Sequence, residues 1–313
     1  MRRFSNREKR IAMEDLHRTR LLGALAVAAA SVLWGTTGVS ASLAPEVPPM
    51  AIGAAAMGGG GLLQALTALP QIDRSAARLR SRRLFLFCSA LLVALYPLAF
   101  YSSMRLAGIT AGTVVSIGSA PVFAALIEWA AEGRRPSPRL TAASALGAAG
   151  IAVLCIARSG GPAGPSVSAG IALGLAAGFT YAGYSWAAGR LMRAGIPSRA
   201  AMGVMFGAAS VLLLPVLLAT GAPFLHSAVN LSVGLYMALV PMFLGYLLFG
   251  AGLARISASE ATAISLLEPA VAALLAALVA GERLSAPAWG GIALIFACLA
   301  LVVSPRGRKP PRG

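Results

Sequence analysis

The chain contains the stretch Ala111-Gly-Thr-Val-Val-Ser-Ile-Gly-Ser-Ala-Pro121-Val-Phe-Ala-Ala-Leu-Ile127 and, 148 residues later, Ser259-Glu-Ala-Thr-Ala-Ile-Ser-Leu-Leu-Glu-Pro269-Ala-Val-Ala-Ala-Leu-Leu275. This offset aligns the two prolines and also pairs Gly133 with Gly281. A similar offset of 147 aligns Ala29-Ala-Ser-Val-Leu-Trp34 with Ala176-Ala-Gly-Phe-Thr-Tyr181. The chain is therefore built from two related halves.

The composition of the chain is that of an integral membrane protein. Hydrophobic residues make up 58% of its 313 positions and charged residues 12%, with a mean hydropathy of +0.79, whereas charged residues are about a quarter of a soluble domain. A spanning helix needs about 20 apolar residues, so ten spans leave room only for short loops. We expect these spans at 21–41, 50–69, 84–103, 109–130, 140–157, 169–189, 200–219, 231–253, 259–280 and 287–304.

The net charge of +16 is distributed as a topology signal. If residues 1–20 lie in the cytoplasm, 23 of the 26 lysines and arginines fall on the cytoplasmic side, and the outer connections hold only Arg105, Arg158 and Arg283. The positive-inside rule then predicts both termini in the cytoplasm, with a basic arm at 1–20 and a basic tail at 305–313. No continuous basic stripe is left for nucleic acid, so we expect no such partner.

The first hydrophobic stretch has a second interpretation, a cleavable signal peptide that ends at Val39-Ser40-Ala41. Its length of about 21 residues and its repeat counterpart in the second half favour a retained span. Because five spans is an odd number, the halves 21–158 and 166–304 should cross the membrane in opposite directions. The predicted fold is all-α, with ten transmembrane helices as two inverted five-helix repeats around a central cavity, an architecture typical of secondary transporters. The alternative is a duplication that only enlarged the bundle.

The two aligned prolines fall near the middle of their spans. Each removes a helical hydrogen bond and frees the carbonyl four residues earlier, at Ile117 and Ser265. Such carbonyls need polar neighbours or a watered cavity at that depth. We therefore expect matched helix breaks at Pro121 and Pro269 beside a solute pathway; kinks used only for packing are the alternative.

Three glutamates lie within or at the ends of the spans. Glu260 follows Ser257 at the spacing of a capping box, which indicates a structural role. Glu128 lies near Arg134 and Arg135 and is interpreted as an interfacial charge. Glu268 has no cationic partner at its depth in the sequence, and an intramembrane carboxyl is by default a candidate functional group. It could carry a coupling proton or pair with a substrate ammonium; a neutral carboxyl that bonds carbonyls near Pro269 is the alternative.

Several aromatic residues also fall deep within the spans, where their rings could provide apolar walls with polar edges for an amphiphilic solute. Ordinary packing explains any one of them equally well. The full set of candidate substrate-binding or cavity residues is Trp34, Tyr96, Ser119, Pro121, Tyr181, Tyr246, Ser265, Glu268 and Pro269.

The chain resembles the drug/metabolite transporter superfamily, and within it the ten-span EamA type. The resemblance rests on Ser31-Val-Leu-Trp-Gly35, on 101–107 leading into the Pro121 segment, and on 258–270 followed by Gly281-Glu-Arg-Leu284. In the first half, Glu-Gly-Arg-Arg at 132–135 departs from the last of these motifs. Within the superfamily the chain is most similar to bacterial exporters of aromatic and other hydrophobic amino acids. The resemblance implies an inner-membrane exporter of small amphiphilic solutes that works by alternating access.

Catalytic sites are poorly supported by the sequence. It has no Walker-type loop for ATP, and Gly183-Tyr-Ser-Trp-Ala187 lacks the final glycine of a nucleophile elbow. His17 and His226 fall on opposite sides of the predicted membrane, and the three cysteines have no CxxC spacing. We expect no enzyme activity, metal or cofactor. The expected partners are a small-molecule substrate and membrane lipids, with a coupling proton as a further candidate. An intramembrane enzyme or lipid-handling protein is the alternative class.

Overall fold

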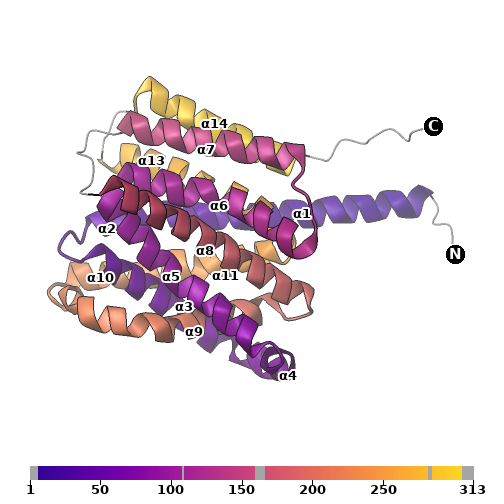
Figure 1. Cartoon of the computed structure of the whole chain (residues 1–313), viewed down its shortest axis with the longest axis horizontal. Helices are drawn as coiled ribbons and strands as arrows, with labels where there is room; N and C mark the ends of the chain where they lie inside the picture. Colours follow the sequence, from indigo (N-terminus) through magenta and orange to yellow (C-terminus); the bar gives the residue numbers. More distant parts are fainter. Residues whose placement is uncertain (1–5, 108, 159–165, 281–283, 305–313) are drawn as a thin grey trace.

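The computed structural model describes residues 6–107, 109–158, 166–280 and 284–304, and its regular elements within these ranges are all helices (Figure 1). They are α1 (Asn6–Gly35), α2 (Thr37–Ser42), α3 (Pro49–Arg74), α4 (Ala76–Arg80), α5 (Arg83–Ala107), α6 (Ile109–Glu132), α7 (Pro138–Arg158), α8 (Val167–Arg193), α9 (Ser198–Thr220), η1 (Ala222–Leu225), α10 (Ala228–Met237), η2 (Ala238–Leu244), α11 (Gly245–Leu253), α12 (Ala258–Ile264), α13 (Leu267–Ala280) and α14 (Ala286–Val303).

Nine helical segments of the described residues are long and apolar enough to cross a membrane. The apolar stretch of α7, Pro138–Leu154, is shorter and corresponds to the span expected at 140–157. The chain is therefore a multi-pass membrane protein. Many leucines, valines and phenylalanines are exposed on the helices, which suits a lipid environment; Leu84, Val211 and Leu218 are at least 70% exposed.

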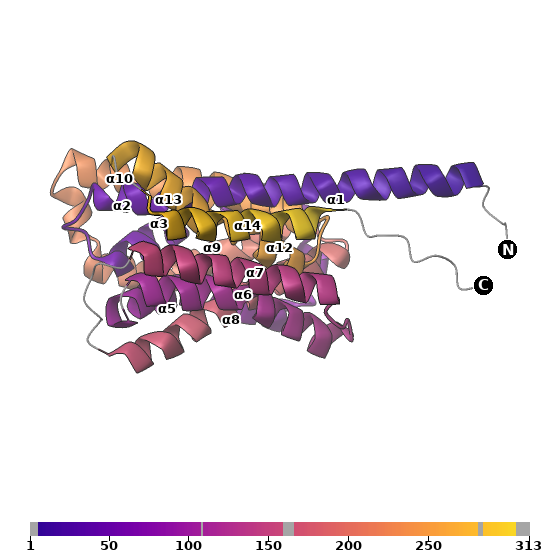
Figure 2. The same ribbon diagram turned by 90° about the horizontal axis from the view of Figure 1, so that it is seen from above.

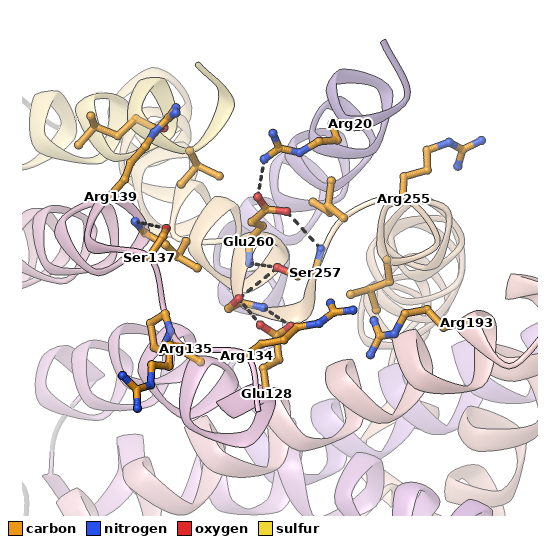
Figure 3. A pocket seen from close by; sticks show the side chains of 18 of the residues that line it. Arg20, Glu128, Arg134, Arg135, Ser137, Arg139, Arg193, Arg255, Ser257 and Glu260 are labelled. Carbon is orange, nitrogen blue, oxygen red and sulfur yellow. Dashed lines mark hydrogen bonds and ion pairs between the residues drawn. The ribbon is translucent and has the colours of Figure 1, made fainter. Parts of the chain in front are cut away.

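The helices lie side by side along one common direction, and α1 projects beyond the others (Figures 1 and 2). Residues 6–20, which belong to the basic arm expected at 1–20, form the first part of α1 and continue directly into its apolar part. The start of α1 and the end of α14 lie at the same end of the bundle (Figure 2). We call this end the basic end, because the arginines of the α6–α7 connection also lie there (Figure 3).

The principal helix contacts occur in corresponding pairs: when each helix is replaced by its counterpart in the other half, a second observed contact results. α5 packs against α8, and its counterpart α11 packs against α1. In the same way α6 contacts α8, while α13 contacts α1. The remaining principal contacts, of α3 with α9 and of α7 with α14, each join a helix to its own counterpart. The two halves are thus interleaved, and most of the buried surface lies between them.

Serine caps define the starts of two helices in the second half. Ser227 accepts a hydrogen bond from the Asn230 amide at the start of α10. The capping box predicted from the sequence is confirmed at α12, where Ser257 accepts from the Glu260 amide and the Glu260 side chain accepts from the Ser257 amide. These bonds satisfy amide groups that a helix cannot pair internally.

Two interruptions divide the spans of the second half. The first is the π-helical segment η2, which contains Pro241 and joins α10 to α11. The next span is broken between α12 and α13 at Ser265 and Leu266. Because Pro269 lacks an amide hydrogen, it cannot bond to the Ser265 carbonyl; that carbonyl instead accepts from the Glu268 amide at 3.0 Å.

The sequence predicts a helix break at Pro121 to match the one at Pro269, and this prediction is wrong. α6 continues through Pro121 to Glu132 as one helix. A proline within a helix removes one bond but does not end the helix when neighbouring helices pack along it, and α6 packs against α8, α5, α12 and α7. The two halves therefore differ at the aligned prolines.

Helices α7 and α14 approach closely through Gly150 and Gly291. A Cβ atom on Gly291 would lie 2.7 Å from the carbonyl oxygen of Gly150 and 2.7 Å from the amide nitrogen of Leu154. A Cβ on Gly150 would in turn lie 2.7 Å from the Gly291 oxygen. The neighbouring Gly290 points into open space, with no atom within 4 Å.

We expect Gly291→Leu to lower the melting temperature of the purified protein, because the side chain would force two backbones apart at a cost of about 1–3 kcal/mol. Gly290→Leu is the matched control and should leave the melting temperature unchanged. Thermal unfolding in detergent compares the two variants with the wild type. Equal effects of both substitutions would contradict the close approach of α7 and α14.

Candidate functional site

Aromatic rings from both halves form a continuous cluster in the middle of the bundle. We define the aromatic cluster by its ring contacts as Trp34, Tyr96, Tyr181, Tyr184, Phe206, Tyr246 and Phe249. The ring centroid of Trp34 lies 4.9 Å from that of Tyr246 and 6.4 Å from that of Tyr181. Tyr96 lies 5.5 Å from Tyr181. The structure thus brings together four aromatic residues that the sequence singled out as candidates.

The polar atoms of the aromatic cluster are only partly satisfied. Trp34 donates its Nε1 hydrogen to the carbonyl of Pro241 at 2.9 Å, and the hydroxyls of Tyr184 and Tyr246 lie 2.7 Å apart. The hydroxyl of Tyr181 is buried and forms no hydrogen bond of standard geometry among the described residues, although the Ser265 side chain lies close enough to interact with it. A buried hydroxyl without a partner is costly, so this group is available to a bound solute or water.

Glu268 lies beside this cluster, in the first turn of α13. Its side chain is partly exposed and makes no hydrogen bond or ion pair with any residue in the described ranges. The carboxylate is close enough to four tyrosines to interact with them electrostatically; these are Tyr96, Tyr101, Tyr181 and Tyr246. A carboxyl group therefore borders aromatic rings, an arrangement suited to a solute with a cationic end and an apolar body.

The remaining candidates are divided between two locations. Ser265 and Pro269 flank the α12–α13 break next to Glu268, and the Ser265 hydroxyl donates to the Thr262 carbonyl at 2.8 Å. Ser119 lies on α6, donates to the Ser116 carbonyl at 3.3 Å and faces Gly178 of α8. Pro121 is buried on the same helix. Ser119 and Pro121 are therefore not part of the aromatic cluster as defined by its ring contacts.

A separate cavity of about 360 Å³ opens at the basic end (Figure 3). Six arginines from different segments line it: Arg20, Arg134, Arg135, Arg139, Arg193 and Arg255. Glu128 and Glu260 also contribute to the lining. The sequence shows these arginines only as scattered cytoplasmic charges, so their convergence on one cavity was not predicted.

Glu128 closes the inner side of this cavity, and its interpretation as an interfacial charge is wrong. Its side chain is only 6% exposed. One carboxylate oxygen accepts from the Ala258 amide at 2.9 Å and the Ser259 amide at 3.3 Å, and the other accepts from the Ser259 hydroxyl at 2.5 Å. A first-half carboxylate thereby caps the first turn of α12 in the second half. Arg134, the expected partner, pairs with Glu132 instead at 3.3 Å.

Two further carboxylates join helices at the basic end. Glu260 pairs with Arg20 of α1 at 2.5 Å. Glu132, at the end of α6, pairs with Arg193 of α8 and also accepts from the Trp186 Nε1 at 2.9 Å. With Glu128 these bonds connect α1, α6, α8 and α12 at this end of the bundle, and Figure 3 draws those of Glu128 and Glu260.

Groups of three or more potential metal ligands are absent from the described part of the chain. Cys298 is buried and Cys88 is exposed, and they lie on different helices. The motif segment at 281–283 and the side chain of Cys155 lie outside what the structure describes. The candidate site is therefore best characterised by Glu268 and the aromatic cluster.

Comparisons with known proteins agree in pointing to membrane transport. The model of the EamA-like transporter family matches residues 21–156 and again 168–304. The uncharacterized transporter YwfM of Bacillus subtilis is 35% identical over 288 residues, which is 91% of this chain and 94% of that protein. The uncharacterized inner membrane transporter YicL of Salmonella typhimurium is 26% identical over 291 residues, covering 90% and 94% of the two chains.

A solved structure titled "Crystal structure of protein" has a similar fold, with a TM-score of 0.75. It shares 21% sequence identity and covers 89% of this chain and 95% of its own. At this identity the match shows the fold alone.

Proposed function

Because the chain belongs to the EamA-like transporter family, we propose that it is a secondary transporter that exports small amphiphilic organic solutes from the bacterial cytoplasm across the inner membrane. Aromatic and other hydrophobic amino acids are the leading substrates. The observation that carries this proposal is the carboxylate of Glu268, which has no partner among the described residues and borders rings from both halves.

The proposed topology has ten spans, arranged as two inverted repeats with both termini in the cytoplasm. Three observations support it: the family model matches each half, α7 supplies an apolar helix beside the nine long ones, and the helix contacts correspond when the halves are exchanged. The placement of the start of α1 and the end of α14 at one end of the bundle agrees with an even number of crossings (Figure 2). The arginine distribution assigns the basic end to the cytoplasm.

The proposed substrate class follows from the chemistry of the central site. An ammonium group can pair with the Glu268 carboxylate, and an aromatic or aliphatic side chain can pack against Trp34, Tyr96 and Tyr181. The free hydroxyl of Tyr181 can bond to the polar end of the solute. Other amphiphilic metabolites and cationic drugs have the same features and are the second candidates within this fold.

Alternating access requires that α12 change position. In the structure it lies between the basic end and the central site, and Glu128 holds its start. We propose that breaking these bonds opens the central site to the cytoplasm, while movement of the two halves closes the other side. Glu268 could bind the solute directly or carry a coupling proton.

Counterflow in proteoliposomes tests this function. Vesicles containing the purified protein are preloaded with one unlabelled compound, which is phenylalanine, tryptophan, leucine, uridine or a cationic drug, and are diluted into a trace amount of the same compound in labelled form. We expect transient, saturable accumulation of the labelled hydrophobic amino acids, and none in vesicles without protein. If no amino acid exchanges, the assigned substrate class is wrong, and exchange of uridine or the drug would identify the alternative.

A further inference from the structure

The cavity at the basic end has a large excess of positive charge. Its lining contains six guanidinium groups and only two carboxylates, Glu128 and Glu260. The carboxylate of Glu128 is already occupied by the start of α12, and that of Glu260 is paired with Arg20. Arg139 donates to the carbonyls of Leu301 and Ser304. The lining that the structure describes contains no third carboxylate for the remaining arginines.

The nearest additional carboxylate, Glu132, does not remove this excess. It pairs with both Arg134 and Arg193, so one negative charge serves two guanidinium groups. Arg135 makes no hydrogen bond or ion pair with the residues that the structure describes. Among the described residues, Arg255 bonds only to the Ala251 carbonyl near the end of α11, at 2.6 Å. Like charges gathered in this way repel one another unless an anion lies between them.

Membrane topology alone does not explain this arrangement. The positive-inside rule requires basic residues on the cytoplasmic side, but it does not require them to meet around one cavity. Here they come from α1, the α6–α7 connection, α7, α8 and the α11–α12 connection (Figure 3). The volume of about 360 Å³ is that of a small-molecule site. Arginine is suited to such a site because its planar group binds carboxylate or phosphate oxygens in pairs.

The position of the cavity connects it to the central site. Ser257 and Ser259 at the start of α12 belong to its lining, while Ser265 and Glu268 follow the end of α12. A seven-residue helix is about 10 Å long. The cavity and the central site therefore lie at opposite ends of one short helix.

We propose that the arginine-lined cavity is an anion-binding entry site that holds the carboxylate or phosphate group of a soluble cytoplasmic solute before α12 moves. This inference rests on the proposed transport function and adds a requirement for the substrate: besides its apolar and cationic parts, it carries an oxyanion. A phosphate group of an anionic lipid has the same chemistry, so the test must separate the two sources.

Isothermal titration calorimetry of the full-length protein in lipid-free detergent provides the direct test, with inorganic phosphate as the probe. Phosphate is chosen because it has no apolar or cationic part that the aromatic cluster and Glu268 would bind. We expect saturable binding that is about tenfold weaker in the Arg134→Gln/Arg135→Gln variant, which loses charge-assisted hydrogen bonds. The matched control is Arg82→Gln/Arg83→Gln, a consecutive arginine pair outside the cavity lining, which should bind as the wild type does.

Phenylalanine and phenylalaninamide extend the test to a solute. The arginine double variant should weaken the binding of phenylalanine more than that of the amide, which lacks a carboxylate. Absence of saturable phosphate binding, or equal affinity in both double variants, would overturn the proposal. Binding of a fluorescent phosphatidylglycerol in nanodiscs that depends on Arg134 and Arg135, without phosphate binding in detergent, would assign the cavity to lipid and overturn the entry site.

The outcome can be separated from that of the transport test. Calorimetry requires no transport, so phosphate binding would stand even if no amino acid showed counterflow. Conversely, amino-acid counterflow without phosphate binding would retain the proposed function and remove only the entry site.

Discussion

Glu268→Gln is expected to reduce amino-acid counterflow about tenfold to a hundredfold, the effect of losing a charge-assisted bond to a substrate ammonium. Glutamine nearly preserves the size of the side chain and removes only its charge and its ability to carry a proton. If Glu268 carries the coupling proton, the remaining transport should also lose its dependence on pH. Initial rates measured between pH 5.5 and 8.5, a window of about three units around neutrality, test both effects.

Glu46→Gln is the control for this experiment. Glu46 is an exposed carboxyl in the connection between α2 and α3, away from the aromatic cluster. The same change of charge there should leave both the rate and its pH profile intact. Wild-type transport with an unchanged pH profile in Glu268→Gln would exclude Glu268 from both substrate binding and proton coupling.

Glu128→Ala is expected to favour a state that is open at the basic end. The substitution removes the acceptor for the Ala258 and Ser259 amides and for the Ser259 hydroxyl. Leaving buried donors unpaired costs about 3 kcal/mol, which shifts an equilibrium between closed and open states about a hundredfold. Opening should become more frequent, because α12 would be held at its start chiefly by the bond between Glu260 and Arg20.

Cys298 can report this movement. It is fully buried on α14, and its sulfur lies 3.7 Å from the Ala263 carbonyl of α12. In a protein whose other cysteines are replaced by Cys88→Ser and Cys155→Ser, Glu128→Ala should speed the reaction of Cys298 with a maleimide.

The control for the maleimide experiment is Glu132→Ala. It removes a carboxylate one turn further along α6, which binds α8 rather than α12. Cys298 should then react at the wild-type rate. Slow labelling in Glu128→Ala, or equally rapid labelling in both variants, would show that Glu128 does not specifically hold α12.

Local patterns in the sequence predicted much of the helical arrangement. Apolar length located the nine long spans, because a membrane imposes a minimum length on each helix. The capping box at Ser257 and Glu260 was also recognisable, since its partners are three residues apart. The aromatic candidates Trp34, Tyr181 and Tyr246 were found because they lie deep in apolar segments.

Features that depend on partners far apart in the chain could not be predicted in this way. Glu128 was assigned to the interface because arginines follow it closely, whereas its actual partners are about 130 residues away. The break at Pro269 has no counterpart at Pro121, because a proline weakens a helix but packing decides whether it ends. The sequence also contains the run Gly58-Gly-Gly-Gly61, and only the fold gives a reason for it: at 59–61, α9 and η2 approach α3 too closely for side chains.

The π-helical segment η2 makes the central site sensitive to a change of chain length. An α-helix turns by about 100° for each residue, and a π-helical turn accommodates more residues than an α-helical one. Deleting one residue from Ala238–Leu244 would restore α-helical spacing but rotate α11 relative to α10. Tyr246 and Phe249 would then turn away from Trp34, although every residue of the aromatic cluster would still be present in the chain. The register of this span is therefore as much a determinant of the binding surface as the identity of its residues.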